Sequence, residues 1–185
     1  MYAYVYFAKH ARGDADFGWT DVEPNNILVD HHKTTTSIST PKLGDLGDTV
    51  RVQPTTNHII GAPIFRAPEV FLGLPWSESV DIWSFGVTIL DLLTGKHFFA
   101  PPNVPEDEEL FDTQYDEIAG PVLEVVHALN QITDRDPSLQ QKYKRTLSDS
   151  LHAEDLDFLL HFMHVDPRDR PSAAQLLEHP WFRDV

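Results

Sequence analysis

The amino-acid sequence predicts a mainly α-helical fold with a small β-hairpin element near its N-terminal end. Its 185 residues are 41% hydrophobic and 11% aromatic, which is enough to bury a core and argues against general disorder. Apolar residues recur at helical spacing in several segments after residue 77, whereas short β-branched runs stand nearer the start. This length suits one domain, or a large piece of one.

The β element is predicted from two short segments that flank a polar stretch. Asn25–Val29 is a β-branched run, and an extended pattern resumes at Lys42–Asp45 after the polar residues 30–41. We interpret the two segments as the strands of a hairpin. Residues 1–20 are interpreted as one strand and a loop. Residues 47–68 contain several Thr, Gly and Pro with little periodicity, which is typical of a long functional loop.

The strongest helical pattern covers Ser77–Gly95. Its apolar residues recur every three or four positions, and a glycine is placed to end the helix; the apolar positions are Val80, Trp83, Val87, Leu90 and Leu93. This helix is expected to be buried.

Three further amphipathic helices are predicted over residues 118–129, 153–165 and 172–178. Ser172 is a good N-cap for the last of them, and Pro180 is placed to stop it. The sum is a mostly helical unit without internal repeats.

The chain carries a large excess of acid, with 29 Asp and Glu against 14 Lys and Arg and a net charge of −15. This charge opposes binding to nucleic acid and to anionic membranes, so the expected partners are basic. The apolar start, residues 1–8, is too short to cross a bilayer and is a poor signal peptide. Cysteine is absent, which excludes disulfides, thiol nucleophiles and cysteine-ligated zinc. We expect an intracellular protein of the cytoplasm or the nucleus.

Several short motifs follow one another in an informative order. Asp21 and Asn26 stand five positions apart, and the triplet Asp45-Leu46-Gly47 follows a short strand. Further motifs come later in the chain: Gly61–Glu69, which ends in Ala-Pro-Glu, then Asp81–Gly86, Asp166–Pro171 and His179–Phe182. Together these motifs resemble the eukaryotic protein kinases of the serine/threonine type.

The resemblance covers about residues 19–185 and implies the large C-terminal lobe of the kinase fold, from the catalytic loop to the final helix. Residues 1–18 would be an N-terminal extension of unclear structure. The small lobe of a kinase supplies a Gly-rich loop, a strand lysine and a helix glutamate, and no match to these is found. Lys9 lies too close to Asp21 for the intervening sheet and helices. The small lobe is therefore expected to be absent.

The same resemblance implies a chemical role for individual residues. Asp21 would accept the proton of the substrate hydroxyl, while the Asn26 amide and the Asp45 carboxylate would hold Mg²⁺ on the phosphates of ATP. Arg170 would pair with Glu69 in a buried ion pair that joins two distant segments.

Two more residues are implied to be structural. Asp81 would anchor the backbone of the catalytic loop, and Trp83, on the same helix, would help to hold the lobe together.

Two substitutions resemble one branch of the family. Thr20 stands where most kinases have Arg, and Leu46 where they have Phe, as in the serine/arginine-rich protein kinases and their fungal relatives. The insert before Tyr115–Ala119 also resembles that branch. The likeness implies a protein or peptide substrate, and an Arg/Ser-rich peptide is its finer expectation. Without the Arg, a phosphate on the activation segment lacks its usual guanidinium partner, so threonines there are poor candidates for a switch.

The catalytic loop departs from the family pattern at two positions. Trp19 replaces a His that packs beneath the metal-binding triplet, and Glu23 replaces the Lys that steadies the transferred phosphate. A unit charge pair at roughly 6 Å and an effective dielectric of about 20 is worth about 2.8 kcal/mol, so reversing one charge turns attraction into repulsion of that order. The sequence therefore predicts weak or absent catalysis.

Three hypotheses remain open at this point. The first is a protein serine/threonine kinase-like enzyme that uses ATP and Mg²⁺. The second is a pseudokinase or scaffold lobe that binds basic peptides, for which the acidic segment 101–117 is either a docking surface or a solvated face. The third is a fragment of a longer kinase gene.

A zinc site at His161 and His164 is the one metal alternative that the sequence raises. The two stand one helical turn apart, yet no carboxylate motif accompanies them, so both are interpreted as residues on the faces of one helix.

Overall fold

The computed structural model of this chain describes residues 17–18, 21–29, 42–45, 47, 50–51, 59–95, 97 and 151–182. The helix predicted over residues 118–129 and the acidic segment 101–117 lie outside the described residues, as do most of residues 1–20. Trp19, Thr20 and Leu46 also lie outside them.

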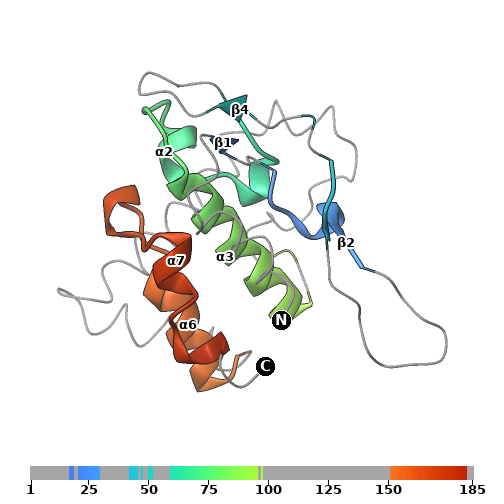
Figure 1. Ribbon diagram of the computed structural model, residues 1–185, viewed down its shortest axis with the longest axis vertical. Coiled ribbons are helices and arrows are strands. Elements are labelled where there is room, and N and C mark those ends of the chain that lie inside the picture. Colours follow the sequence, from blue (N-terminus) through green and yellow to red (C-terminus); the bar gives the residue numbers. More distant parts are fainter. Residues whose placement is uncertain are drawn as a thin grey trace.

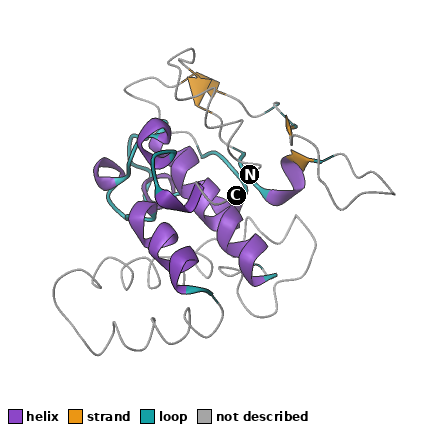
Figure 2. Cartoon of the chain, turned by 60° about the horizontal axis from the view of Figure 1, so that its bottom comes forward, coloured by secondary structure: helices purple, strands orange, loops and turns teal. Residues whose placement is uncertain are grey.

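A long helix, α3 (Ser79–Thr94), forms the centre of the described part. Helices α6 (Ala153–Phe162) and α7 (Ala173–Leu176) lie beside it, and the short helix α2 (Pro68–Phe71) lies at its N-terminal end (Figure 1). The short strands lie apart from this helical group, on one side of it (Figure 2). The predicted fold class, mainly helical with a small β element, is confirmed for the described residues.

Helix α3 matches its prediction closely. It ends where Gly95 takes the left-handed conformation (φ 68°) and its N–H donates to the carbonyl of Asp91 at 2.8 Å. Its predicted apolar positions are buried up to Leu90, but Leu93 is 37% exposed. The apolar stripe therefore loses contact with the core in the last turn.

The predicted hairpin is present, although its first strand begins later than expected. Strand β2 (Ile27–Leu28) pairs antiparallel with β3 (Lys42–Leu43), with Ile27 opposite Leu43. The two residues before β2 were predicted to be extended, but they belong to a one-turn 3₁₀ helix, η1 (Pro24–Asn26). Proline fixes a helical φ at the first position of this turn.

A second antiparallel pair joins β1 (Phe17–Gly18) to β4 (Val50–Arg51). This pairing places the residues just before the predicted catalytic loop next to a segment that follows Asp45 in the sequence.

Proline also opens three other one-turn helices, which have these bounds: η2 (Pro63–Phe65), η4 (Pro167–Asp169) and η5 (Pro180–Phe182). η2 lies inside the segment 47–68, which was interpreted as a loop, and α2 begins at Pro68, the last residue of that segment. These turns are too short to show helical periodicity, so the sequence did not reveal them.

The C-terminal helices are confirmed with shorter bounds. α6 ends at Phe162, not at residue 165, so His164 follows the helix; the prediction that His161 and His164 both lie on this helix is wrong for His164. The side chain of Ser172 accepts from the N–H of Gln175, and the Gln175 side chain accepts from the N–H of Ser172. This capping box confirms Ser172 as the N-cap of α7.

The core lies between α3 and α6. Phe85 and Phe162 stack with ring centroids 5.9 Å apart, and Phe158 stacks on Trp181 at 4.3 Å. Gly86 allows this close approach, because a Cβ there would lie 2.5 Å from the Phe162 ring. None of the helices that the structure describes has the length and apolar composition needed to cross a membrane.

Candidate functional site

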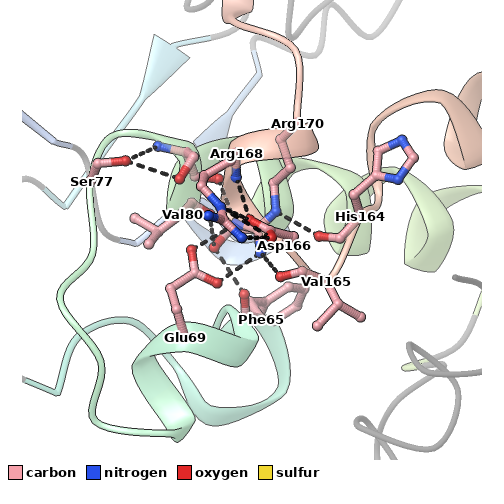
Figure 3. Close-up of polar contacts among 11 residues, drawn as sticks. Phe65, Glu69, Ser77, Val80, His164, Val165, Asp166, Arg168 and Arg170 are labelled. Atoms are coloured by element: carbon pink, nitrogen blue, oxygen red, sulfur yellow. Dashed lines mark hydrogen bonds and ion pairs between the residues drawn. The ribbon is translucent and has the colours of Figure 1, made fainter.

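An ion pair predicted from the sequence ties the end of the chain to α2 (Figure 3). The NH1 and NH2 groups of Arg170 donate to the two carboxylate oxygens of Glu69, each at 2.7 Å. Both side chains are almost fully buried, at 0% and 2% exposure. The bidentate geometry satisfies both oxygens at once, so the desolvation of the carboxylate is offset.

The remaining donors of Arg170 reach backbone carbonyls. Nε donates to His164 at 2.8 Å, NH1 also donates to Ser79 at 2.9 Å, and NH2 to Val165 at 3.1 Å. A guanidinium has five N–H groups, and these contacts together with Glu69 account for all of them. Arg170 therefore joins α2, the start of α3 and the chain after α6.

Trp83 and Asp81, which were expected to be structural, both lie in the buried part of α3. Trp83 is fully buried, and the Arg170 guanidinium lies 5.2 Å from the centroid of its ring. Asp81 is 3% exposed in the first turn of the helix. That Asp81 anchors the backbone of the catalytic loop stays a prediction; Trp19 and Thr20 of that loop lie outside the described residues.

The first candidate site residues, Asp21 and Asn26, contact one another directly. The Asn26 side-chain amide donates to Asp21 Oδ2 at 2.7 Å and to the Asp21 carbonyl at 3.1 Å. The N–H of Ala62 reaches Asp21 Oδ1 at 3.4 Å. Asp21 is half-buried and Asn26 is 8% exposed, so the loop holds both groups in fixed positions.

Helix α3 fixes this loop through a side-chain hydrogen bond. The hydroxyl of Thr88, which is fully buried, donates to the carbonyl of Val22 at 3.1 Å. Val22 is itself 3% exposed, so the residue after Asp21 is fixed by both a hydrogen bond and packing. This contact spans 66 positions in the sequence, and no local pattern predicts it.

Asp45 is brought to the same place by the hairpin. The N–H of Gly44 donates to the carbonyl of Asn26 at 2.7 Å, which extends the β2–β3 pairing to the edge of the site. Asp45 takes a left-handed conformation (φ 44°), which Asp tolerates better than most residues, and its carboxylate is exposed. The three residues predicted to form the site therefore lie together.

These residues line an open pocket of about 810 Å³. We call it the acidic pocket, because three of its lining residues, Asp21, Glu23 and Asp45, carry carboxylates. The lining also includes Arg66 and His97, which the sequence had not singled out. The other lining residues come from the loop around η1 and from residues 47–65.

Glu23 has an unfavourable position for a charged carboxylate. Its burial raises the pKa of the Glu23 carboxyl, and the charges of Asp21 and Asp45 raise it further. A hydrogen bond from Asn25 and the nearby His97 act in the opposite direction and only partly offset this. The acidic pocket therefore concentrates negative charge at the position where the family resemblance expects a lysine.

The two basic residues of the pocket lie in different settings. Arg66 donates from Nε and NH2 to the carbonyls of Ile60 and Gly61 at 2.7–3.1 Å, so its charge organises the segment before η2. His97 contacts Asp91, a buried residue of α3, at 2.8 Å, and its side chain is 58% exposed. Sequence reasoning missed both, because each depends on contacts made only after folding.

Oxygen atoms are the ligands that this pocket offers to a cation. The Asn26 amide nitrogen donates to Asp21, which leaves the amide oxygen to act as a ligand in the same pocket as the exposed carboxylate of Asp45. Within the described residues no group of three or more His, Cys, Asp or Glu is arranged for a metal. The donor set suits Mg²⁺ with one or two protein oxygens, the rest coming from water and phosphate.

The comparison with known proteins agrees with this arrangement. A family model of the protein kinase domain matches residues 10–182, and the chain therefore belongs to the eukaryotic protein kinase family. The match begins before residue 19, where the motifs had placed the start of the domain.

Individual relatives are protein kinases of several kinds. Serine/threonine-protein kinase SKY1 of Saccharomyces cerevisiae is 27% identical over 193 residues, which cover 87% of this chain and 25% of that protein. Calcium-dependent protein kinase 14 of Arabidopsis thaliana is 34% identical over 166 residues, covering 89% and 26%. MAP kinase kinase kinase wis4 of Schizosaccharomyces pombe is 28% identical over 179 residues, covering 89% and 11%. The chain thus spans about a quarter or less of these relatives.

Proposed function

We propose that the acidic pocket is the phosphoryl-transfer site of a protein serine/threonine kinase, and that the described helices belong to the large lobe of that fold. The observation that carries this proposal is the convergence of Asp21, Asn26 and Asp45 in one pocket. They come from a 3₁₀ turn, the residues before it and the end of a hairpin, so residues from two separate sequence motifs share one pocket.

In this proposal Asp21 accepts the proton of a substrate hydroxyl. Its Oδ2 is oriented by the Asn26 amide and its Oδ1 by the N–H of Ala62, so the carboxylate is held in one orientation. Asn26 and Asp45 hold Mg²⁺, which neutralises the charge of the ATP phosphates when nucleotide is bound. The substrate is a basic Ser- or Thr-containing peptide, since the chain carries a net charge of −15.

Glu23 makes the proposed reaction slow. Its carboxylate shares the pocket with Asp21 and Asp45, and burial already disfavours its charge. An anionic phosphoryl group entering this pocket is repelled where a cation would attract it.

The test measures transfer of the γ-phosphate of ATP to a Ser-containing basic peptide by the full chain with Mg²⁺. Glu23→Lys is expected to raise the rate by about tenfold or more, since one unit charge is reversed at short range. Asp21→Asn in the same background should lower the rate by about a hundredfold or more. Glu178→Lys, an exposed change outside the pocket, is the matched control.

A second candidate is a kinase-like scaffold that binds basic peptides without transferring phosphate. The negative charge at Glu23 is the observation that favours it. No phosphate transfer by either the wild type or Glu23→Lys, together with salt-sensitive binding of a basic peptide, would support the scaffold over the enzyme.

A further inference from the structure

Two threonines of α3 direct their hydroxyl groups differently. Thr94 donates to the carbonyl of Leu90, four residues earlier, at 2.7 Å, which is a common contact of a hydroxyl inside a helix. Thr88 donates instead to the carbonyl of Val22 at 3.1 Å, across 66 positions of the sequence. Its side chain is fully buried, so the contact is shielded from bulk solvent. The Thr88 hydroxyl therefore holds the loop that carries Asp21.

Val22 stands between two residues of the acidic pocket. Asp21 and Glu23 line the pocket, whereas the Val22 side chain is 3% exposed and packs in the core. The Val22 carbonyl belongs to the planar peptide group that joins Val22 to Glu23, so the contact with Thr88 fixes the plane of that peptide. Because the Val22 side chain is packed as well, the backbone is fixed on both sides of this residue.

The other hydrogen bonds of this loop are made within the loop itself. The side-chain amide of Asn26 donates to the Asp21 carbonyl and to Asp21 Oδ2, and the backbone N–H of Asn26 donates to the Glu23 carbonyl at 3.1 Å. These contacts give the loop its shape, but they do not attach it to the helices. The Thr88 hydroxyl makes that attachment to α3.

The same helix also holds the segment around Phe65, which forms another part of the pocket lining. The Ser84 hydroxyl, which is buried, donates to the carbonyl of Phe65 at 2.8 Å. Ser84 and Thr88 are four residues apart, so their side chains lie on the same face of α3. The helix therefore sets the position of the Asp21 loop relative to the segment around Phe65.

We propose that Thr88 is a positioning residue for phosphoryl transfer: its hydroxyl, acting through the Val22 carbonyl, sets the direction of the Asp21 carboxylate. This inference rests on the proposed function, in which Asp21 accepts the proton of the substrate hydroxyl. Without the Thr88 hydroxyl, the buried Val22 carbonyl loses its donor, and the peptide group turns toward another partner. Asp21 then leaves its productive orientation, and a displacement of about 1 Å is enough to lower a rate by about a hundredfold.

The test compares Thr88→Val, which keeps the shape of the side chain without its hydroxyl, with Thr88→Ser, which keeps the hydroxyl. Both changes are made in the full chain carrying Glu23→Lys, and transfer from Mg²⁺–ATP to a Ser-containing basic peptide is measured. Thr88→Val should lower kcat by about tenfold or more and change the KM for ATP by less than about twofold. Thr88→Ser should retain most of the kcat.

The KM for ATP is expected to stay nearly constant because the hairpin holds the proposed Mg²⁺ ligands separately. The N–H of Gly44 donates to the Asn26 carbonyl at 2.7 Å, and Asp45 follows Gly44 directly. Neither contact involves Thr88.

Thr94→Val is the matched control for the loss of a hydroxyl. It makes the same chemical change on the same helix, but Thr94 lies outside the described lining of the pocket and its hydroxyl contacts its own helix. This variant should leave both kcat and KM unchanged. Thermal melts ensure that every assay is run well below the unfolding midpoint. If Thr88 only stabilised the fold, Thr88→Val would lower that midpoint and leave kcat unchanged.

Two sets of outcomes would overturn the inference in distinguishable ways. Unchanged kcat in Thr88→Val, equal losses in Thr88→Val and Thr88→Ser, or a KM for ATP that rises together with the loss of kcat would show that the hydroxyl does not position Asp21, while the proposed function stands. If the Glu23→Lys chain with Thr88 intact transfers no phosphate, the proposed function fails and this inference fails with it.

Discussion

The Glu69–Arg170 pair and the acidic pocket are both built from charged side chains, but the two regions treat those charges differently. In the pair, each carboxylate oxygen and each guanidinium N–H has a partner, and water is excluded. In the pocket, three carboxylates share one open space, while the basic residues of its lining, Arg66 and His97, contact backbone carbonyls and Asp91.

The contacts that hold the fold together and the residues that line the pocket are therefore different sets. The buried pair and the contact of Thr88 with Val22 hold the loop and helices in the arrangement expected of a kinase. In the proposed function the pocket supplies the acidic groups of a phosphoryl-transfer site, and Glu23 stands there where the family resemblance expects a lysine. Under that proposal the supporting contacts are kept while the reactivity of the site is lowered.

The largest expected effect comes from breaking the buried pair. Arg170→Ala leaves Glu69 charged and buried without its partner, which should lower the free energy of unfolding by about 3–5 kcal/mol. Arg168→Ala is the matched control, because Arg168 pairs with Asp166 at an exposed position and should leave the unfolding midpoint almost unchanged. Urea unfolding followed by fluorescence measures both; similar losses would show that the buried pair is not the stronger contact.

A smaller loss of stability is expected when a methyl group is added where α3 and α6 approach closely. In Gly86→Ala the new methyl group would lie 2.5 Å from the Phe162 ring and 2.7 Å from Met163, so the helices must move apart. The cost should be about 1–3 kcal/mol, although alanine is the better helix former. Combining it with Phe162→Leu should cost less than the sum of the two changes. Strict additivity in urea unfolding would contradict the predicted clash.

The pocket should respond to Glu23→Gln with a small gain in stability that depends on pH. Because the folded-state pKa of Glu23 is raised above 4.5, the wild type loses stability as pH rises through that folded-state pKa. The variant should therefore melt about 1–2 °C above the wild type at neutral pH, and at the same temperature as the wild type at about pH 4. Glu178→Gln at an exposed position should show neither effect. A larger gain at acid pH would reverse the sign and contradict the account.

Much of this arrangement could be predicted from sequence where the signal is local or belongs to an ordered set of motifs. The bounds of α3 followed from its apolar spacing and Gly95, and the cap of α7 followed from Ser172. The meeting of Asp21, Asn26 and Asp45 and the Glu69–Arg170 contact were implied by the resemblance to protein kinases that the ordered motifs carry.

Other features depend on tertiary contacts and left no sequence pattern. The contact of His97 with Asp91 requires the chain to reverse after a left-handed glycine, and an exposed His carries no signal of its partner. The end of α6 at Phe162 was missed because the apolar residues Met163 and Val165 continue the helical pattern after the helix has stopped. Leu93 continues the apolar spacing of α3 although the core does not extend to it.

The proposed function requires a nucleotide site in the described fold whose affinity is limited by the charge at Glu23. The most direct measurement is a thermal melt of the wild type and of Glu23→Lys with and without millimolar Mg²⁺–ATP, because a ligand that binds the native state raises the midpoint. We predict a rise of about 3 °C or more for Glu23→Lys and less than half of that for the wild type. Equal shifts in the two proteins, or no shift in either, would contradict the account.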